Sequence, residues 1–322
     1  MTQVTYLEAI RRTLDSALED DDRVLLIGED VGSGGGAFRA TEGLQEKYGI
    51  DRVRDTPISE SAFTGVAIGL ALAGWRPIVE YQFADFLTCG FTQIVNVAAK
   101  MHFRTRQHVP MVIRAPAGGG FSGGPFHSQN PEAWFLRTPG LKVVCPATVE
   151  DVGLLLAAAV RDPNPVVFLE QKNLYTRIKG SYAASSDDSV EGARLARAGT
   201  DLTVVTYGAA LPTVLEAAKA VRAEVDVEVI DLRVLCPLDW DTVAASVTRT
   251  SRCVVVTEDY AEYGVGAEVS ARVAEQLFEE LDAPVRRLGS GFWPIPFSPP
   301  LEAATLPGVD QIASLLLSTA RF

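Results

Sequence analysis

Short apolar segments alternate with helical patterns along most of this 322-residue chain, and this alternation most constrains its fold. Segments such as 24–27 are apolar throughout, which is typical of strands buried on both faces of a sheet. The first helical pattern covers 5–20, where apolar residues recur at helical spacing: Leu7, Ile10, Leu14 and Leu18. An α/β fold follows, with a largely parallel sheet covered on both faces by helices.

The alternation occurs twice, so the sequence predicts two doubly wound α/β domains. The expected strands are 24–27, 77–81, 111–114, 142–145 and 166–170, and then 202–207, 227–231 and 253–257. The expected helices are 5–20, 61–73, 91–103, 150–161, 211–223, 241–249 and 265–281. A small, polar run separates the two series. We therefore expect a first domain at 1–180, a linker at 181–200 and a second domain at 201–322.

Composition excludes several classes of protein. The formal net charge of −12 argues against nucleic acid or an anionic membrane as a partner. The four cysteines are widely spaced and form no CxxC pair, so neither a zinc site nor a disulfide scaffold is expected. The N-terminus lacks the pattern of a signal peptide, and no long uncharged apolar run is flanked for membrane insertion. A cytoplasmic protein is predicted.

One isolated acid stands out. Glu60 is the only charged residue between Asp55 and Arg76, and it lies where a loop leads into a helix of small and apolar residues. Two interpretations are open. Acidic residues favour the first turn of a helix for electrostatic reasons alone. Alternatively, Glu60 is a buried functional acid, because an apolar pocket raises a carboxyl pKa until it holds or shares a proton near neutrality.

A histidine and an aromatic segment are the other candidates. His127 follows a strand and a glycine-rich loop, so it falls at the carboxyl end of a parallel strand, where α/β sites form. It could equally be an ordinary loop histidine, whereas His102 and His108 are interpreted as surface or packing residues. The aromatics Tyr81 to Phe86 either pack in the core or offer a face to a heteroaromatic ring. No phosphate-binding P-loop or HExxH motif occurs, and the loop 32–36 lacks the GxGxxG pattern.

Taken together, these segments resemble a known family. The motifs that carry the resemblance occur in order at 28–32 (GEDVG), 55–60 (DTPISE), 82–86 (QFADF), 127–129 (HSQ), 139–144 (PGLKVV) and 294–302 (PIPFSPPLE). They resemble the β subunit of the thiamine diphosphate-dependent 2-oxo acid dehydrogenases. The resemblance runs nearly end to end and implies a transketolase-like pyrimidine-binding domain followed by a transketolase C-terminal domain.

The resemblance also implies roles for individual residues. Glu60 matches the glutamate that hydrogen-bonds N1′ of the cofactor's aminopyrimidine. Phe86 matches the aromatic position beside that ring, although many branched-chain members carry Tyr there. Glu29, Ile58 and Gln82 match positions that line the cofactor. Loss of the cofactor's C2 proton needs a buried acid at N1′, a requirement that the apolar surroundings of Glu60 would meet.

Two further positions come from the resemblance. His127 matches the active-site histidine near the substrate carbonyl, and we expect it to orient the substrate or to act as an acid during acyl transfer to a lipoyl group. Asp162 and Asn164 match residues that hold a structural potassium in some members. That ion is bound mostly by backbone carbonyls, so the side chains indicate it only weakly.

The chain also lacks one family motif. Thiamine enzymes usually hold magnesium and diphosphate with a Gly-Asp-Gly motif, which does not occur here. An α subunit is therefore expected to supply those contacts, in a heterotetramer of two α and two β subunits. The acidic second domain is expected to dock the basic subunit-binding domain of a lipoyl acyltransferase core.

The sequence leaves more than one substrate open. The stretch from His127 to Ala133 resembles branched-chain members more than pyruvate members, so an acyl-transferring branched-chain 2-oxo acid dehydrogenase (class EC 1.2.4.-) is favoured. The β subunit of a pyruvate or acetoin dehydrogenase is the first alternative. A single-chain transketolase or deoxyxylulose phosphate synthase is disfavoured by the missing motif and the short length. A non-catalytic scaffold subunit is the remaining alternative, although Glu60 and His127 are both present.

Overall fold

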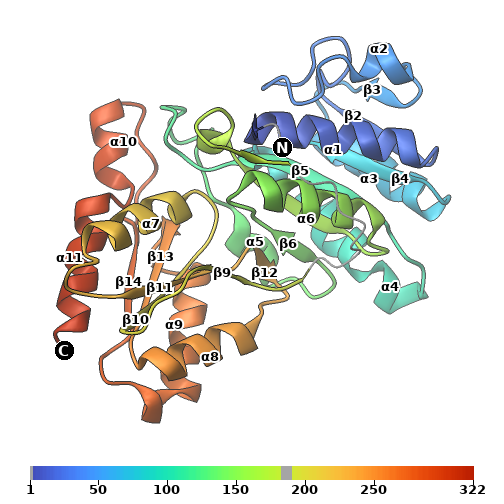
Figure 1. The fold of residues 1–322 in the computed structure, drawn as a ribbon. Coiled ribbons are helices and arrows are strands. Elements are labelled where there is room, and N and C mark those ends of the chain that lie inside the picture. The colour runs from blue at the N-terminus through green and yellow to red at the C-terminus, as the bar shows by residue number, and fades with distance from the viewer. Residues whose placement is uncertain (1–2, 183–190) are drawn as a thin grey trace. The chain divides into compact units, whose positions relative to one another are not determined.

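The computed structural model describes residues 3–182 and 191–322. The chain separates into two compact units, each with its own sheet (Figure 1). The first unit comprises Met1–Ala117 and Trp134–Val190, and the second comprises Gly118–Ala133 and Glu191–Phe322. The glycine-rich segment that ends with Ala133 thus belongs to the second unit, although it lies within the expected first domain.

The first unit is built on a parallel sheet in the order β6-β7-β5-β4-β2-β3. Its strands are β2 (Val24–Gly28), β3 (Val53–Asp55), β4 (Arg76–Glu80), β5 (Val112–Ala117), β6 (Lys142–Val144) and β7 (Val166–Gln171). Every residue of β2, β5 and β7 is buried, which confirms the parallel sheet covered on both faces. A separate antiparallel pair joins β1 (Gln3–Thr5) to β8 (Lys179–Ser181).

Helices cover the two faces of this sheet (Figure 1). Helix α1 (Tyr6–Asp20) packs against α6 (Val149–Arg161), and α3 (Glu60–Leu72) packs against β4 from the opposite face. Both α1 and α6 begin at a threonine whose hydroxyl accepts a hydrogen bond from a backbone N–H of the first turn. The shorter elements are α2 (Leu44–Tyr48), η1 (Ala84–Thr88), η2 (Gln93–Ala98), α4 (Ala99–Thr105) and η3 (Lys172–Leu174). The short helix α5 (Glu132–Leu136) begins in the segment assigned to the second unit and ends in the first.

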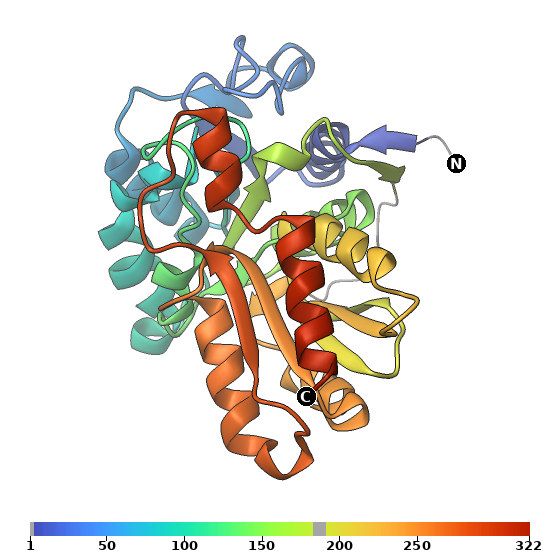
Figure 2. The same ribbon diagram turned by 90° about the vertical axis from the view of Figure 1, so that its left-hand side faces the viewer.

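The second unit has a sheet in the order β14-β13-β10-β11-β9. Its strands are β9 (Arg194–Arg197), β10 (Leu202–Thr206), β11 (Val227–Asp231), β13 (Cys253–Tyr260) and β14 (Arg286–Ser290), and only the edge strand β9 is antiparallel. Helices α7 (Ala210–Ala220) and α11 (Val309–Ala320) pack together on one face (Figure 2). Helices α8 (Trp240–Thr250) and α9 (Val265–Gln276) cover the other face, which gives the expected doubly wound arrangement. The unit also contains β12 (Val234–Cys236), η4 (Phe278–Glu280) and α10 (Pro299–Thr305).

Three expectations differ from the structure. Part of the expected linker, 183–190, lies outside the described residues, and Arg194–Arg197 within it forms β9. The expected helix 91–103 is a π-helix over Gln93–Ala98 that continues as α4. The expected helix 265–281 ends at Gln276 and is followed by η4. Its last turn contains Glu275 and no basic residue, a charge pattern that opposes the helix dipole.

The described residues contain neither a membrane span nor an assembled metal cluster. Across 3–182 and 191–322, every helix is too short or too polar to cross a bilayer. The same residues contain no group of three or more His, Cys, Asp or Glu side chains placed to share a metal ion. All four cysteines lie in the described part of the chain and are free thiols.

Candidate functional site

The ends of three adjacent parallel strands define one edge of the first unit's sheet. Gly28 at the end of β2 is in register with Asp55 of β3 on one side and Glu80 of β4 on the other. The chains approach closely here: a Cβ on Gly28 would lie 2.4 Å from the carbonyl oxygen of Glu80. This edge is where ligands bind in open α/β sheets. The segments that leave it carry Glu29, Glu60 and Gln82, so the structure brings these predicted site residues together.

Two carboxylates interact at this edge. Glu29 is buried, with a side-chain oxygen, Oε1, that has no hydrogen-bond partner among the described residues. Burial raises the pKa of Glu29, and the nearby charges of Glu60 and Asp30 raise it further, against a hydrogen bond from the backbone of Ser59. Glu60 is the first residue of α3, and it is half-buried rather than buried as expected, because the first turn of the helix faces the open edge of the sheet. The structure therefore places a carboxyl group with a raised pKa beside Glu60.

Gln82 and Ile58 occupy different environments. The amide nitrogen of Gln82 donates to Oδ2 of Asp30 over 3.1 Å, which ties the segment after β4 to the segment after β2. Ile58 is 82% exposed, although a branched aliphatic side chain is usually covered. Within this chain Ile58 therefore does not line an enclosed site, and a surface from another molecule would be needed to cover it.

The aromatic segment does not form one flat face. Phe86 meets Phe83 edge-on, with ring centroids 5.8 Å apart, and Phe83 in turn meets Phe38 at 5.4 Å. Tyr81 turns inward: its hydroxyl lies 2.6 Å from Oγ1 of Thr64, and burial together with the charge of Glu60 raises its pKa. Phe86 is half-buried, so part of its side chain is exposed.

A buried ion network lies beneath this edge. Arg114 on β5 donates to both carboxylate oxygens of Glu170 on β7, over 2.6 and 3.0 Å, and to Glu80 on β4 over 2.5 Å. The hydroxyl of Tyr175 donates to Glu170 over 2.7 Å. All of these side chains are almost fully buried, so each charge depends on the others for its hydrogen bonds. The network fixes the spacing of three strands that end near the site.

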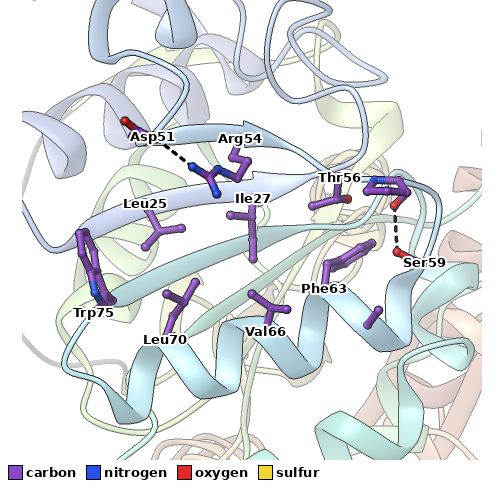
Figure 3. Close-up of a pocket in the computed structure, with 12 residues that line it drawn as sticks. Leu25, Ile27, Asp51, Arg54, Thr56, Ser59, Phe63, Val66, Leu70 and Trp75 are labelled. Atoms are coloured by element: carbon purple, nitrogen blue, oxygen red, sulfur yellow. Dashed lines mark hydrogen bonds and ion pairs between the residues drawn. The ribbon is translucent and has the colours of Figure 1, made fainter.

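An apolar pocket of about 660 Å³ lies behind the turn that leads to Glu60 (Figure 3). Side chains of β2, of β3 and the turn that follows it, and of α3 line it, including Ile27, Phe63 and Leu70. Val66 and Trp75 at this surface are 57% and 38% exposed. Helix α3 thus presents apolar side chains outward as well as toward the sheet, which a helix covered on only one face would not do.

His127 lies in the second unit, on the segment that joins it to the first. Its backbone N–H donates to the carbonyl of Gly124 over 3.3 Å, and the side chain is half-buried. The preceding loop has left-handed backbone conformations at Gly118, Gly120, Ser122 and Gly124, which explains its glycine content. The histidine is therefore carried by a tightly turned loop.

The second unit also contains two buried acids, Glu132 and Asp259. Burial raises the pKa of Glu132 to about 7, with a further increase from the charge of Glu258, although Tyr207 donates a hydrogen bond to its Oε1 over 2.7 Å. Burial also raises the pKa of Asp259 to about 8, and the charges of Glu132 and Glu258 add to the shift. These acids thus titrate near neutral pH, which no local pattern in the sequence predicts.

The proposed potassium residues already have partners. Asp162 is buried at the end of α6, and Nζ of Lys142 donates to its Oδ2 over 2.6 Å. The backbone N–H of Asn164 donates to Oδ1 of the same carboxylate over 2.8 Å. A lysine ammonium therefore neutralises this carboxylate, so a potassium ion here would rely on backbone carbonyls.

Comparison with known proteins gives the class of the fold. Residues 2–177 match the family described as "Transketolase, pyrimidine binding domain", and residues 191–312 match "Transketolase, C-terminal domain". A solved structure titled "Split gene transketolase, inactive beta4 tetramer" has the same fold, with a TM-score of 0.78 and 21% sequence identity over 99% of this chain and 100% of that chain. The chain thus consists of two transketolase-type domains.

More similar relatives narrow the class. The chain is 41% identical to the 2-oxoisovalerate dehydrogenase subunit beta of Bacillus subtilis, with full coverage of both chains. It is 44% identical to the 3-methyl-2-oxobutanoate dehydrogenase subunit beta of Mycobacterium tuberculosis, over 96% of this chain and 90% of that protein. It is 46% identical to the pyruvate dehydrogenase E1 component subunit beta of Acholeplasma laidlawii, over 90% of each. The chain belongs to the family of β subunits of 2-oxo acid dehydrogenases.

Several of the polar residues that the structure brings together could not be identified from the sequence. Asp30 was not singled out as the partner of Gln82, nor were Glu132 and Asp259 as buried acids. Arg114 was read only as part of a strand. A charged residue inside an otherwise apolar strand is the one signal that could have identified the ion network.

Proposed function

We propose that this chain, together with an α subunit, forms a thiamine diphosphate-dependent dehydrogenase that oxidatively decarboxylates a branched-chain 2-oxo acid and transfers the acyl group to a lipoyl group. The observation that carries the proposal is the convergence of Glu29, Glu60 and Gln82 at adjacent strand ends in a transketolase pyrimidine-binding domain. The charge of Glu60 helps to raise the pKa of Glu29, which supports the interpretation that the two side chains lie close together.

The residues present fit the aminopyrimidine half of the cofactor. The side chain of Glu60 has no hydrogen bond or ion pair among residues 3–182 and 191–322, so its carboxyl group is available to N1′ of the ring. Gln82 and the half-buried ring of Phe86 lie on the segment that would flank the pyrimidine. Thiamine diphosphate, when bound, would supply the electron sink that decarboxylation of a 2-oxo acid requires.

The chain's own groups would hold the ring and control one proton. Glu60 would donate or share a proton at N1′, and Glu29 lies beside it with a pKa that burial and the charge of Glu60 raise. His127 would orient the substrate or act as an acid during acyl transfer. Magnesium and the diphosphate would be held mainly by the α subunit, because the chain contains no Gly-Asp-Gly motif.

Exposed apolar side chains beside the candidate site support assembly with an α subunit in a heterotetramer. Ile58 and Val66 are 82% and 57% exposed beside the turn that leads to Glu60, and burying them against an α subunit would both stabilise the contact and enclose Glu60. The second unit would dock the lipoyl acyltransferase core. With four free thiols, the complex suits the cytoplasm.

Pyruvate is the second candidate substrate, because the Acholeplasma laidlawii relative, at 46% identity, is named a pyruvate dehydrogenase subunit. The test is to co-purify the chain with its α subunit and to measure the reduction of an artificial electron acceptor, with pyruvate and with each of three branched-chain 2-oxo acids. Each assay is run with and without thiamine diphosphate and magnesium. Cofactor-dependent turnover on branched-chain acids supports the proposal, and turnover confined to pyruvate selects the alternative. No turnover on any acid, with cofactor bound, contradicts both and favours an acetoin-type or scaffold role.

A further inference from the structure

The carboxyl-terminal motif at 294–302 ends in an acid that the proposed chemistry does not use. Glu302 lies in α10 and is only 4% exposed. Glu302 has no ion pair within 3–182 and 191–322, so burial of its carboxyl group requires hydrogen-bond partners. Its donors come from a segment some 180 residues earlier in the chain, the glycine-rich loop Gly118–Gly124.

Each carboxylate oxygen of Glu302 accepts a hydrogen bond from a different backbone N–H. The N–H of Gly120 donates to Oε1 over 2.9 Å, and the N–H of Ser122 donates to Oε2 over 2.8 Å. The Ser122 hydroxyl adds a longer contact of 3.3 Å to the same oxygen. A second buried acid continues the pattern: Oε1 of Glu258 accepts from the N–H of Gly119 over 2.8 Å and from Nδ2 of Asn130 over 3.2 Å.

The loop conformation explains why carboxylates are used. Left-handed backbone at Gly118, Gly120, Ser122 and Gly124 alternates with ordinary residues, and such alternation turns successive N–H groups toward one side. A concave row of N–H groups binds an anion, and here the anions are side chains of the same unit. Ser122 has φ of +62°, which a non-glycine residue adopts only when the surrounding contacts hold it there.

The histidine follows directly from the clamped loop. His127 is three residues beyond Gly124 and donates its backbone N–H to the Gly124 carbonyl. A Cβ on Gly123 would lie 3.0 Å from the Cβ of His127, so the loop and the histidine are packed against each other. Asn130, held by Glu258, secures the chain on the other side of His127.

We propose that Glu302, assisted by Glu258, is a positioning residue: its carboxylate holds the loop Gly118–Gly124 in the conformation that presents His127 to the substrate. The inference rests on the proposed function for the role of His127. It also gives the acid of the carboxyl-terminal motif a physical purpose, because a loop with this many glycines has many alternative conformations unless it is held.

The test compares four variants in the complex with the α subunit. Glu302→Ala removes all acceptors. Glu302→Gln keeps one oxygen but turns an amide toward a backbone N–H. Ser122→Ala removes only the 3.3 Å hydroxyl contact, and Glu280→Ala changes an exposed acid of the same unit. The measurements are hydrogen exchange at the Gly120 and Ser122 amides, cofactor affinity, and the separate rates of decarboxylation and of lipoyl acylation.

We expect faster exchange at both amides in Glu302→Ala, unchanged cofactor affinity, and a loss of about 100-fold in lipoyl acylation, the size of effect that a small misplacement of a reacting group produces. Glu302→Gln should lie between this variant and the wild type, whereas Ser122→Ala and Glu280→Ala should stay within about threefold of the wild-type rate. In a His127→Ala background, Glu302→Ala should slow acylation no further.

The proposal would be overturned by exchange at Gly120 and Ser122 that is unchanged in Glu302→Ala, or by faster exchange with acylation unaffected. Additive losses in the double variant would also overturn it, because they would assign Glu302 an effect independent of His127. Absence of any cofactor-dependent turnover in the wild-type complex would refute the proposed function instead. The exchange measurement would then still decide whether Glu302 holds the loop.

Discussion

Replacing Glu132 by Gln should make the second unit more stable at neutral pH and leave it nearly unchanged, or slightly less stable, in acid. Glutamine keeps an oxygen that can accept the hydrogen bond from Tyr207, but it cannot ionise. Burial raises the pKa of Glu132 from its ordinary value of 4.5 to about 7. Between those pH values the folded unit keeps a proton that the unfolded chain releases.

The sign and the size follow from linkage. Because the folded state binds more protons than the unfolded state over this range, the free energy of unfolding falls as pH rises from about 4.5 to about 7 and then levels. At about 1.4 kcal/mol per pKa unit, the total loss is roughly 3 kcal/mol. Glu132→Gln removes that slope. The new amide replaces an oxygen, Oε2, without a partner among the described residues, and so adds a cost of about 1 kcal/mol that does not depend on pH.

Hydrogen exchange at amides of β10 and β13 reports opening of the second unit itself, which is preferable in a chain of two units. Glu216→Gln, at an exposed position, is the matched control and should show no such pH dependence. A second signature concerns Asp259, whose pKa of about 8 should fall, because the charge of Glu132 is one of its causes. A stability difference between Glu132→Gln and wild type that is constant from pH 4.5 to pH 8 would refute the reasoning.

Two further predictions concern the other unit and the loop. Arg114→Met should destabilise the first unit by about 3–5 kcal/mol, because it leaves the buried carboxylates of Glu80 and Glu170 without their cation. Urea unfolding measures this, with the exposed Arg104→Met as the control, and a loss below about 1 kcal/mol would contradict it. His127→Ala should reduce lipoyl acylation about 100-fold or more while leaving cofactor affinity within about threefold. Calorimetric titration with thiamine diphosphate measures the cofactor affinity. A loss of affinity as large as the loss of acylation would count against the assigned role.

The core strands and their order of appearance follow directly from the sequence, because a strand buried on both faces must be apolar throughout. Residues 24–27 illustrate this. The edge strands cannot be predicted from the sequence in the same way. Only Val53 of β3 is buried, so the strand leaves almost no apolar pattern, and β9 lies in a stretch that reads as a linker. Their pairing comes from neighbouring strands rather than from their own composition.

The candidate site was only partly accessible to sequence reasoning. Parallel topology predicts that residues after β2, β3 and β4 meet at one edge, and Glu29, Glu60 and Gln82 do so. Burial was harder to predict, because it depends on packing. Glu60, in an apolar segment, is half-buried, whereas Glu132, in a polar one, is fully buried. No local pattern distinguishes the two acids.

The central claim is that Glu60 is the acid through which this chain supports thiamine diphosphate-dependent decarboxylation. The most direct test measures 2-oxo acid-dependent reduction of an artificial acceptor by the complex with its α subunit, comparing wild type, Glu60→Gln and the exposed control Glu46→Gln. We expect turnover that requires the cofactor in wild type and in Glu46→Gln, and a loss of at least about 100-fold in kcat for Glu60→Gln. Cofactor-dependent turnover by Glu60→Gln within about threefold of wild type would contradict the account.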